Sequence, residues 1–73
     1  MNDKFSQCLK EIRVDKNIAQ KEIAECLGIY TNAYQLYEYG KRKPSFEIFV
    51  KICEYFNVSS DYILGFSDIK ERR

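Results

Sequence analysis

The sequence contains no histidine, only three cysteines, and no glycine-rich loop of the kind that cradles phosphate groups. Histidine is the side chain most often used as a base and as a metal ligand near neutral pH. The cysteines, Cys8, Cys26 and Cys53, are odd in number, lie far apart and sit among apolar helix positions, so we expect buried thiols rather than a disulfide, metal or redox site. The chain is therefore not expected to be an enzyme or to bind a metal or a cofactor.

Long apolar runs are absent as well. No window approaches the ~20 apolar residues of a membrane-spanning helix, and no apolar run follows the first charges as in a signal peptide, so we expect a cytoplasmic protein. The 73 residues, 45% of them hydrophobic, are enough for one hydrophobic core but not for two. The expected organisation is one domain over residues 1–65 and a short polar tail over residues 66–73.

Apolar residues recur at helical spacing, and no segment alternates as a strand would. Phe5, Cys8, Leu9 and Ile12, for example, fall at i, i+3, i+4 and i+7, which is typical of a helix with one buried face. Glycine, asparagine and serine residues at stop and cap positions divide the chain into segments. The sequence thus predicts an all-α domain of five helices, over about residues 3–16, 20–27, 31–39, 45–56 and 59–64.

The segment from Gln20 to Glu38 has the spacing of a helix, a tight turn and a second helix. Gly28 is expected to end the first helix, because the residue after a helix often takes a positive φ that glycine adopts without steric cost. Ala24 is expected at the crossing point, where a larger side chain would hold the two helices apart. This arrangement is typical of proteins that bind DNA.

The second of these helices is predicted to have two different faces. Tyr34 and Tyr37 recur three residues apart on the inner face, and the opposite face carries the hydrogen-bonding side chains Thr31, Asn32 and Gln35. An amide can pair with both the donor and the acceptor of adenine, and threonine can contact a thymine methyl group. The pattern therefore indicates a base-reading surface, although the same three residues without their neighbours would be interpreted as a solvated face.

The net charge of +1 is low for a nucleic-acid-binding module, but the charges are unevenly distributed. Residues 1–40 carry five Lys or Arg against six Asp or Glu, whereas residues 41–73 carry seven against five. Lys41, Arg42 and Lys43 are consecutive and directly follow the predicted recognition helix, where a loop facing phosphates would have to lie. We expect phosphate contacts from this loop; a merely solvated basic loop is the alternative.

Four ordered motifs make the chain resemble the phage Cro/repressor class of helix-turn-helix proteins, also called the XRE family. They are Leu9-Lys-Glu-Ile-Arg13, Gln20-x-x-Ile-Ala-x-x-Leu-Gly28, Glu38-x-Gly-Lys-Arg-Lys-Pro-Ser45 and Val58-Ser-Ser-Asp-Tyr-Ile-Leu-Gly65. The resemblance implies a compact five-helix repressor-like domain whose third helix enters the major groove. It also implies a phosphate contact at Gln20, a structural salt bridge between Arg13 and Glu38, and base contacts at Thr31, Asn32, Gln35 and Leu36.

The chain departs from similar sequences at several positions. Ala19 and Tyr30 replace the usual Ser or Thr before the second and third helices, which removes a capping acceptor worth about 1 kcal/mol at each. Tyr34 and Tyr37 stand at usually aliphatic positions, so their rings are expected in the core with the hydroxyls at its rim. For Tyr30, Tyr39 and also Tyr37, a hydroxyl bound to a phosphate is the other possibility.

These features together predict a sequence-specific transcriptional regulator, a repressor, that binds double-stranded DNA as a homodimer. The dimer interface is expected at the end formed by helices four and five. Its candidate residues are Phe46, Tyr55, Tyr62, Ile63, Phe66 and Ile69. Each of them could equally be a core residue or a scattered apolar residue of the surface. The rival hypothesis is a protein-interaction module with the same fold, such as an antitoxin or anti-repressor. The likeness to phage regulators also implies an origin in a phage or mobile element.

Overall fold

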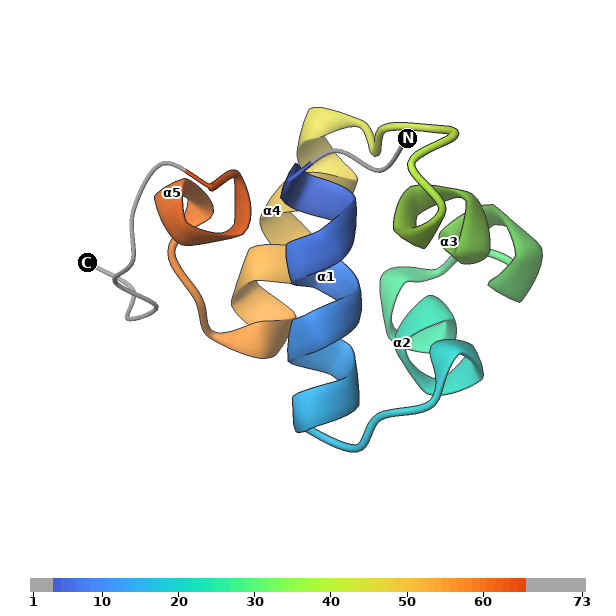
Figure 1. Ribbon diagram of the computed structural model, residues 1–73. Coiled ribbons are helices and arrows are strands. Elements are labelled where there is room, and N and C mark those ends of the chain that lie inside the picture. Colours follow the sequence, from blue (N-terminus) through green and yellow to red (C-terminus); the bar gives the residue numbers. More distant parts are fainter. Residues whose placement is uncertain (1–3, 66–73) are drawn as a thin grey trace.

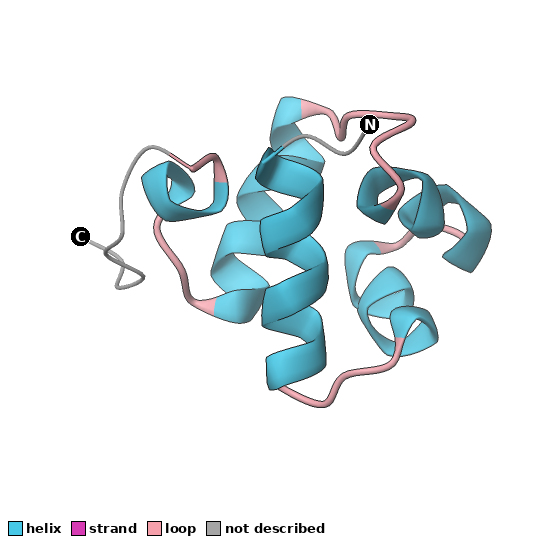
Figure 2. Ribbon diagram, viewed as in Figure 1, coloured by secondary structure: helices cyan, strands magenta, loops and turns pink. Residues whose placement is uncertain are grey.

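A computed structural model describes residues 4–65 of the chain, and within that range all regular structure is helical (Figure 2). The helices are α1 (Lys4–Asp15), α2 (Gln20–Leu27), α3 (Thr31–Glu38), α4 (Phe46–Phe56) and α5 (Ser60–Ile63). The expectation of an all-α, five-helix domain is confirmed. Over these residues no helix is long and apolar enough to cross a membrane.

The helix α1 lies at the centre of the fold, with α2 and α3 on one side of it and α5 on the other (Figure 1). Its apolar positions Phe5, Cys8, Leu9 and Ile12 are all buried, as their spacing predicts. The core continues through α2 to α5 and includes Ile23, Leu27, Tyr34, Ile52, Phe56 and Ile63. One small core therefore holds all five helices, and the outer sides of α2 and α3 remain at the surface.

The turn between α2 and α3 is set by Gly28, which has φ 73° and ψ 29° in the left-handed region. Its N–H donates to the carbonyl of Glu25, and the next N–H, of Ile29, donates to the carbonyl of Ala24. A Cβ on Gly28 would meet nothing within 4 Å, so the glycine is needed for its backbone conformation and not for space. Ala24 is 1% exposed, which agrees with its expected place against the neighbouring helix.

The helix ends follow the predicted caps. Ser45 and Ser59 accept hydrogen bonds from the N–H groups of Ile48 and Tyr62, while Ala19 and Tyr30 provide no side-chain cap. Asn17 and Asn57, the two stop residues proposed for α1 and α4, have φ of 57° and 56°. Small differences remain, since α1 ends at Asp15 and α3 ends at Glu38, each one residue earlier than expected.

One expectation about the cysteines is wrong. Cys8 and Cys53 are buried and reduced, but Cys26 is exposed. The buried face of α2 is formed by Ile23, Ala24 and Leu27, and Cys26 lies outside the arc that these residues share. Burial raises the pKa of the Cys8 thiol, and the nearby Glu11 acts in the same direction. Residues 4–65 contain no group of three or more side chains that could hold a metal ion.

Candidate nucleic-acid interface

The helix α3 divides cleanly into an inner and an outer side. Tyr34, Tyr37 and Glu38 are its buried residues. Asn32 is exposed, and the other residues predicted to read bases, Thr31, Gln35 and Leu36, are partly exposed. The four residues proposed from the sequence thus have side chains with some access to solvent, and all of them lie on this one short helix.

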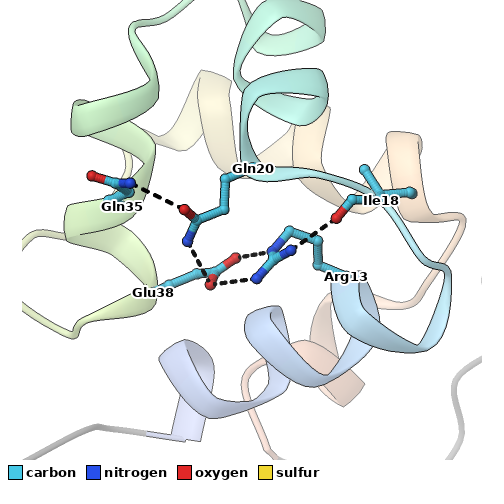
Figure 3. A network of polar contacts seen from close by, with 5 residues as sticks. All are labelled: Arg13, Ile18, Gln20, Gln35 and Glu38. Carbon is cyan, nitrogen blue, oxygen red and sulfur yellow. Dashed lines mark hydrogen bonds and ion pairs between the residues drawn. The ribbon is translucent and has the colours of Figure 1, made fainter.

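The inner side of α3 is joined to α1 by an ion pair between Arg13 and Glu38 (Figure 3). Arg13 Nε donates to Glu38 Oε2 at 2.5 Å, and Arg13 Nη2 donates to Glu38 Oε1 at 3.2 Å. Arg13 Nη1 also donates to the carbonyl of Ile18 at 2.8 Å. The side chain of Glu38 is only 1% exposed, so this pair fixes the position of α3 from inside the protein.

Two amide side chains extend this pair to the surface of α3. Gln20 Nε2 donates to Glu38 Oε1 at 3.2 Å, and Gln35 Nε2 donates to Gln20 Oε1 at 3.1 Å (Figure 3). We call Arg13, Glu38, Gln20 and Gln35 the polar relay. It begins in α1, passes through α3 and α2, and returns to the outer side of α3 at Gln35.

The relay keeps its buried carboxylate charged. Burial by itself raises the pKa of Glu38, but the hydrogen bonds from Arg13 and Gln20 and the nearby Tyr34 hydroxyl outweigh it, so the pKa ends below its ordinary value. The hydrogen bond to Glu38 raises the pKa of Arg13. Burial, followed by the neighbouring Glu38, raises the pKa of Tyr34. The pair is therefore ionised at neutral pH.

The hydroxyl of Tyr34 is the exception in this polar cluster. It is buried and has no hydrogen-bond partner of acceptable geometry within the described part of the chain. The Tyr34 ring makes an edge contact with the ring of Tyr37, with centroids 6.2 Å apart. Both rings lie in the core, as one of the two explanations predicted, but the hydroxyl of Tyr34 is buried as well and not at the rim of the core. Tyr37 is 7% exposed, which leaves little of it for a phosphate, whereas Tyr30 and Tyr39 are 84% and 53% exposed.

The basic segment Lys41–Lys43 follows α3 after Tyr39 and Gly40, and it is exposed. Gly40 precedes it with φ 74°, and the N–H groups of Lys41 and Arg42 both donate to the carbonyl of Leu36, at 3.0 and 3.3 Å. These bonds fold the basic segment back against the end of α3. Three cationic residues are thereby held beside the helix that carries the candidate base-reading groups.

The end formed by α4 and α5 carries the candidate dimer interface. Ile63 is fully buried, so it is a core residue and the suggestion that it lies at an interface is wrong. Tyr55 and Tyr62 pack in part against the core, and Phe46 is 82% exposed. Phe66 and Ile69 lie outside the described residues. Beside Phe46 is an apolar pocket, lined by Phe5, Lys43, Pro44, Phe46, Phe49 and Leu64.

The polar relay is only partly visible in the sequence. The Arg13–Glu38 pair follows from the family resemblance, but the bonds that Gln20 makes to Glu38 and Gln35 do not. Gln20 and Gln35 are 15 positions apart and lie on different helices, so no spacing rule brings their amides together. In this structure the amide of Gln20, expected at a phosphate, is engaged within the protein.

Comparison with known proteins identifies relatives with the helix-turn-helix fold. The profile of the helix-turn-helix family matches residues 9–63. Among curated proteins, the uncharacterized HTH-type transcriptional regulator YqaE of Bacillus subtilis is 40% identical over 60 residues, covering 82% of this chain and 52% of that protein. The HTH-type transcriptional regulator ImmR of the same organism is 38% identical over 64 residues, covering 88% and 50%.

A phage protein and a solved structure extend the comparison. The cryptic phage CTXphi transcriptional repressor RstR of Vibrio cholerae is 32% identical over 54 residues, covering 74% of this chain and 49% of that one. A transcriptional regulator from Listeria innocua superposes with a TM-score of 0.82 at 25% identity, covering 93% of this chain and 64% of that one. The chain spans about half the length of the curated relatives it matches. With its fold, its four motifs and this profile match, the chain belongs to the phage Cro/repressor, or XRE, family of helix-turn-helix proteins.

Proposed function

We propose that this chain is a sequence-specific transcriptional regulator that represses by binding double-stranded DNA, in the cytoplasm, with α3 in the major groove. One observation carries the proposal: amide and hydroxyl side chains gather on the outer side of α3, whose inner side is held by a buried ion pair. Repression is chosen because a relative, RstR, is named a phage repressor. That relative also supports an origin in a phage or mobile element.

The proposed contacts divide into two kinds. Thr31, Asn32 and Gln35 read base edges, because amides and hydroxyls match the donors and acceptors of the major groove, and Leu36 lies against a thymine methyl group. Contacts to phosphates set the register of the protein on DNA and come from exposed or half-exposed groups, namely Gln20, Tyr30, Lys41, Arg42 and Lys43. Tyr37 contributes least to this second set, because it is 7% exposed.

The proposed binding unit is a homodimer. A domain with a net charge of +1 and one short recognition helix makes few contacts by itself, and two linked domains bind more tightly than either one. Two recognition helices would enter major grooves about 34 Å apart on one side of the duplex. Phe46 and Leu64, which are 82% and 39% exposed beside the apolar pocket, support an interface at the α4 and α5 end.

The experiment begins with selection of bound sites from a random DNA pool, followed by measurement of Kd against salt concentration. Arg42→Ala should weaken binding to every sequence alike and reduce the salt slope by about one unit, because one phosphate contact is lost. The control is Lys51→Ala, which removes an exposed cation from the middle of α4 and should leave the slope unchanged. An unchanged slope for Arg42→Ala would mean that the basic segment faces away from DNA.

A protein-interaction role remains the second candidate, since Tyr30 and Phe46 expose large aromatic rings. A domain that binds a protein partner through such rings would have an affinity that depends little on salt, and it would not bind duplex DNA. The same salt series therefore separates the two functions. A steep inverse dependence on salt supports the regulator, and the absence of any binding to duplex DNA supports the antitoxin or anti-repressor role.

A further inference from the structure

The charge of Glu38 fixes how each side-chain amide in the polar relay is turned. The carboxylate of Glu38 can only accept hydrogen bonds, so Gln20 must turn its Nε2 towards Glu38. The oxygen of the same amide is then left for Gln35, which must turn its own Nε2 towards Gln20. Each amide is oriented by the group before it, beginning at a side chain that is 1% exposed.

The consequence appears at the surface end of the relay. With Nε2 bound to Gln20, the Oε1 of Gln35 points away from Gln20 (Figure 3). Reversing the Gln35 amide would place its oxygen against the oxygen of Gln20. The Gln20 oxygen has no proton to donate, and the Gln20 nitrogen is turned towards Glu38. Gln35 therefore presents an acceptor on the outer side of α3, together with the second hydrogen of its amide nitrogen.

We propose that the buried charge of Glu38, transmitted through Gln20, makes Gln35 select adenine over guanine at the base that it meets. This inference rests on the proposed function. Adenine offers an N6 amine and an N7 acceptor in the major groove, which match the outward oxygen and the second amide hydrogen. Guanine offers two acceptors, O6 and N7, and its O6 would meet the oxygen of Gln35. A glutamine free to reverse its amide could donate to guanine instead, so the selectivity belongs to the relay and not to Gln35 by itself.

Gln20 is thus a positioning residue for specificity as well as a phosphate contact. Its Nε2 carries two hydrogens, and the bond to Glu38 uses one of them. The other hydrogen is available to a phosphate, so the two roles are compatible. The two roles can be told apart by measurement. Loss of a phosphate contact weakens binding to all DNA sites equally, whereas loss of the relay changes the ratio of the affinities for two different sites.

The test uses the whole chain and the operator found by selection. The base met by Gln35 is first located as the position where Gln35→Ala abolishes discrimination. There, wild-type protein should bind the adenine operator about 5- to 150-fold more tightly than its guanine counterpart. Gln20→Met, which keeps the length of the side chain but makes neither bond, should reduce that ratio to less than about 3-fold. Arg42→Ala is the matched control, because it should weaken binding to both operators and leave the ratio unchanged.

A second measurement changes the DNA and not the protein, so it is independent of folding. Replacing that adenine by purine, which lacks the N6 amine but keeps N7, should weaken wild-type binding by removing one of the two contacts to Gln35. The proposal is overturned if Gln20→Met keeps the full ratio, if no base position depends on Gln35, if purine binds as well as adenine, or if that position prefers guanine. Each of these results leaves salt-dependent DNA binding intact, whereas the absence of any binding to duplex DNA would overturn the proposed function itself.

Discussion

Replacing Arg13 by methionine should nearly unfold the protein at neutral pH. The change removes both hydrogen bonds that Arg13 makes to Glu38 and its bond to the carbonyl of Ile18. Among the residues that the structure describes, Gln20 would be the one side-chain hydrogen-bond donor left to Glu38, whose side chain is 1% exposed. Leaving one partner of a buried pair uncompensated costs about 3–5 kcal/mol. Because the Arg13 side chain is 14% exposed and water can reach part of the site, we expect about 3 kcal/mol.

That loss is large beside the stability of so small a domain, whose single core supplies roughly 3–5 kcal/mol. Urea unfolding followed by circular dichroism at the helix band would measure it. Arg42→Ala, which also removes one arginine charge but from an exposed position, should change the free energy of unfolding by less than about 0.5 kcal/mol. The double variant Arg13→Met with Glu38→Leu should recover most of the loss, because neither charge is then buried without a partner.

Arg13→Met should also change how the free energy of unfolding depends on pH. In the wild type the pKa of Glu38 is lowered, so its contribution to stability is present above the ordinary glutamate pKa of about 4.3 and is lost as the pH falls below it. Without Arg13, burial raises that pKa, so the variant should be least stable relative to wild type at neutral pH and should recover as Glu38 becomes protonated. A loss below about 1 kcal/mol that does not change with pH would mean that Arg13 does not compensate a buried charge on Glu38.

Other predictions concern the recognition helix and the buried groups. Asn32→Ala should lower affinity by roughly 1–3 kcal/mol at one base position of the operator, measured by Kd on a set of single-base variants, and a uniform loss would show that Asn32 does not read a base. Tyr34→Phe should change the free energy of unfolding by less than about 1 kcal/mol, because the buried hydroxyl has no hydrogen-bond partner among the described residues, and its removal offsets the loss of its favourable effect on the Glu38 carboxylate; a destabilisation above about 2 kcal/mol in urea would mean that it donates to that carboxylate. Native protein treated with a thiol reagent should show one fast reaction, at Cys26, and two slow ones at the buried Cys8 and Cys53, as followed by mass spectrometry.

Local rules accounted for most of the fold. Gly28 and Asn57 end their helices in the left-handed conformation, and Ser45 caps α4 through its side chain, because each depends on residues within one turn. Cys26 shows the limit of reading apolar residues one by one. It is apolar enough for a core, but the buried arc of a two-turn helix is narrow, and Cys26 falls outside it.

The candidate site was predictable in its location more than in its interactions. The outer position of Asn32 follows from helical spacing, because Tyr34 and Tyr37 define the inner side. The bonds of Gln20 to Glu38 and Gln35 depend on how three helices meet and on the rotamers of long side chains. Such contacts leave no periodic signal in a sequence. They are nevertheless what orients the amide that Gln35 offers to DNA in the proposed complex.

Whether the outer side of α3 contacts DNA can be measured by a nuclear magnetic resonance titration of the labelled protein with its selected duplex. We expect the side-chain amide signals of Asn32 and Gln35 to move most, together with the backbone signals of Lys41–Lys43. Unchanged Asn32 and Gln35 amides in a saturated complex, with the shifts confined to residues around Phe46, would contradict this expectation.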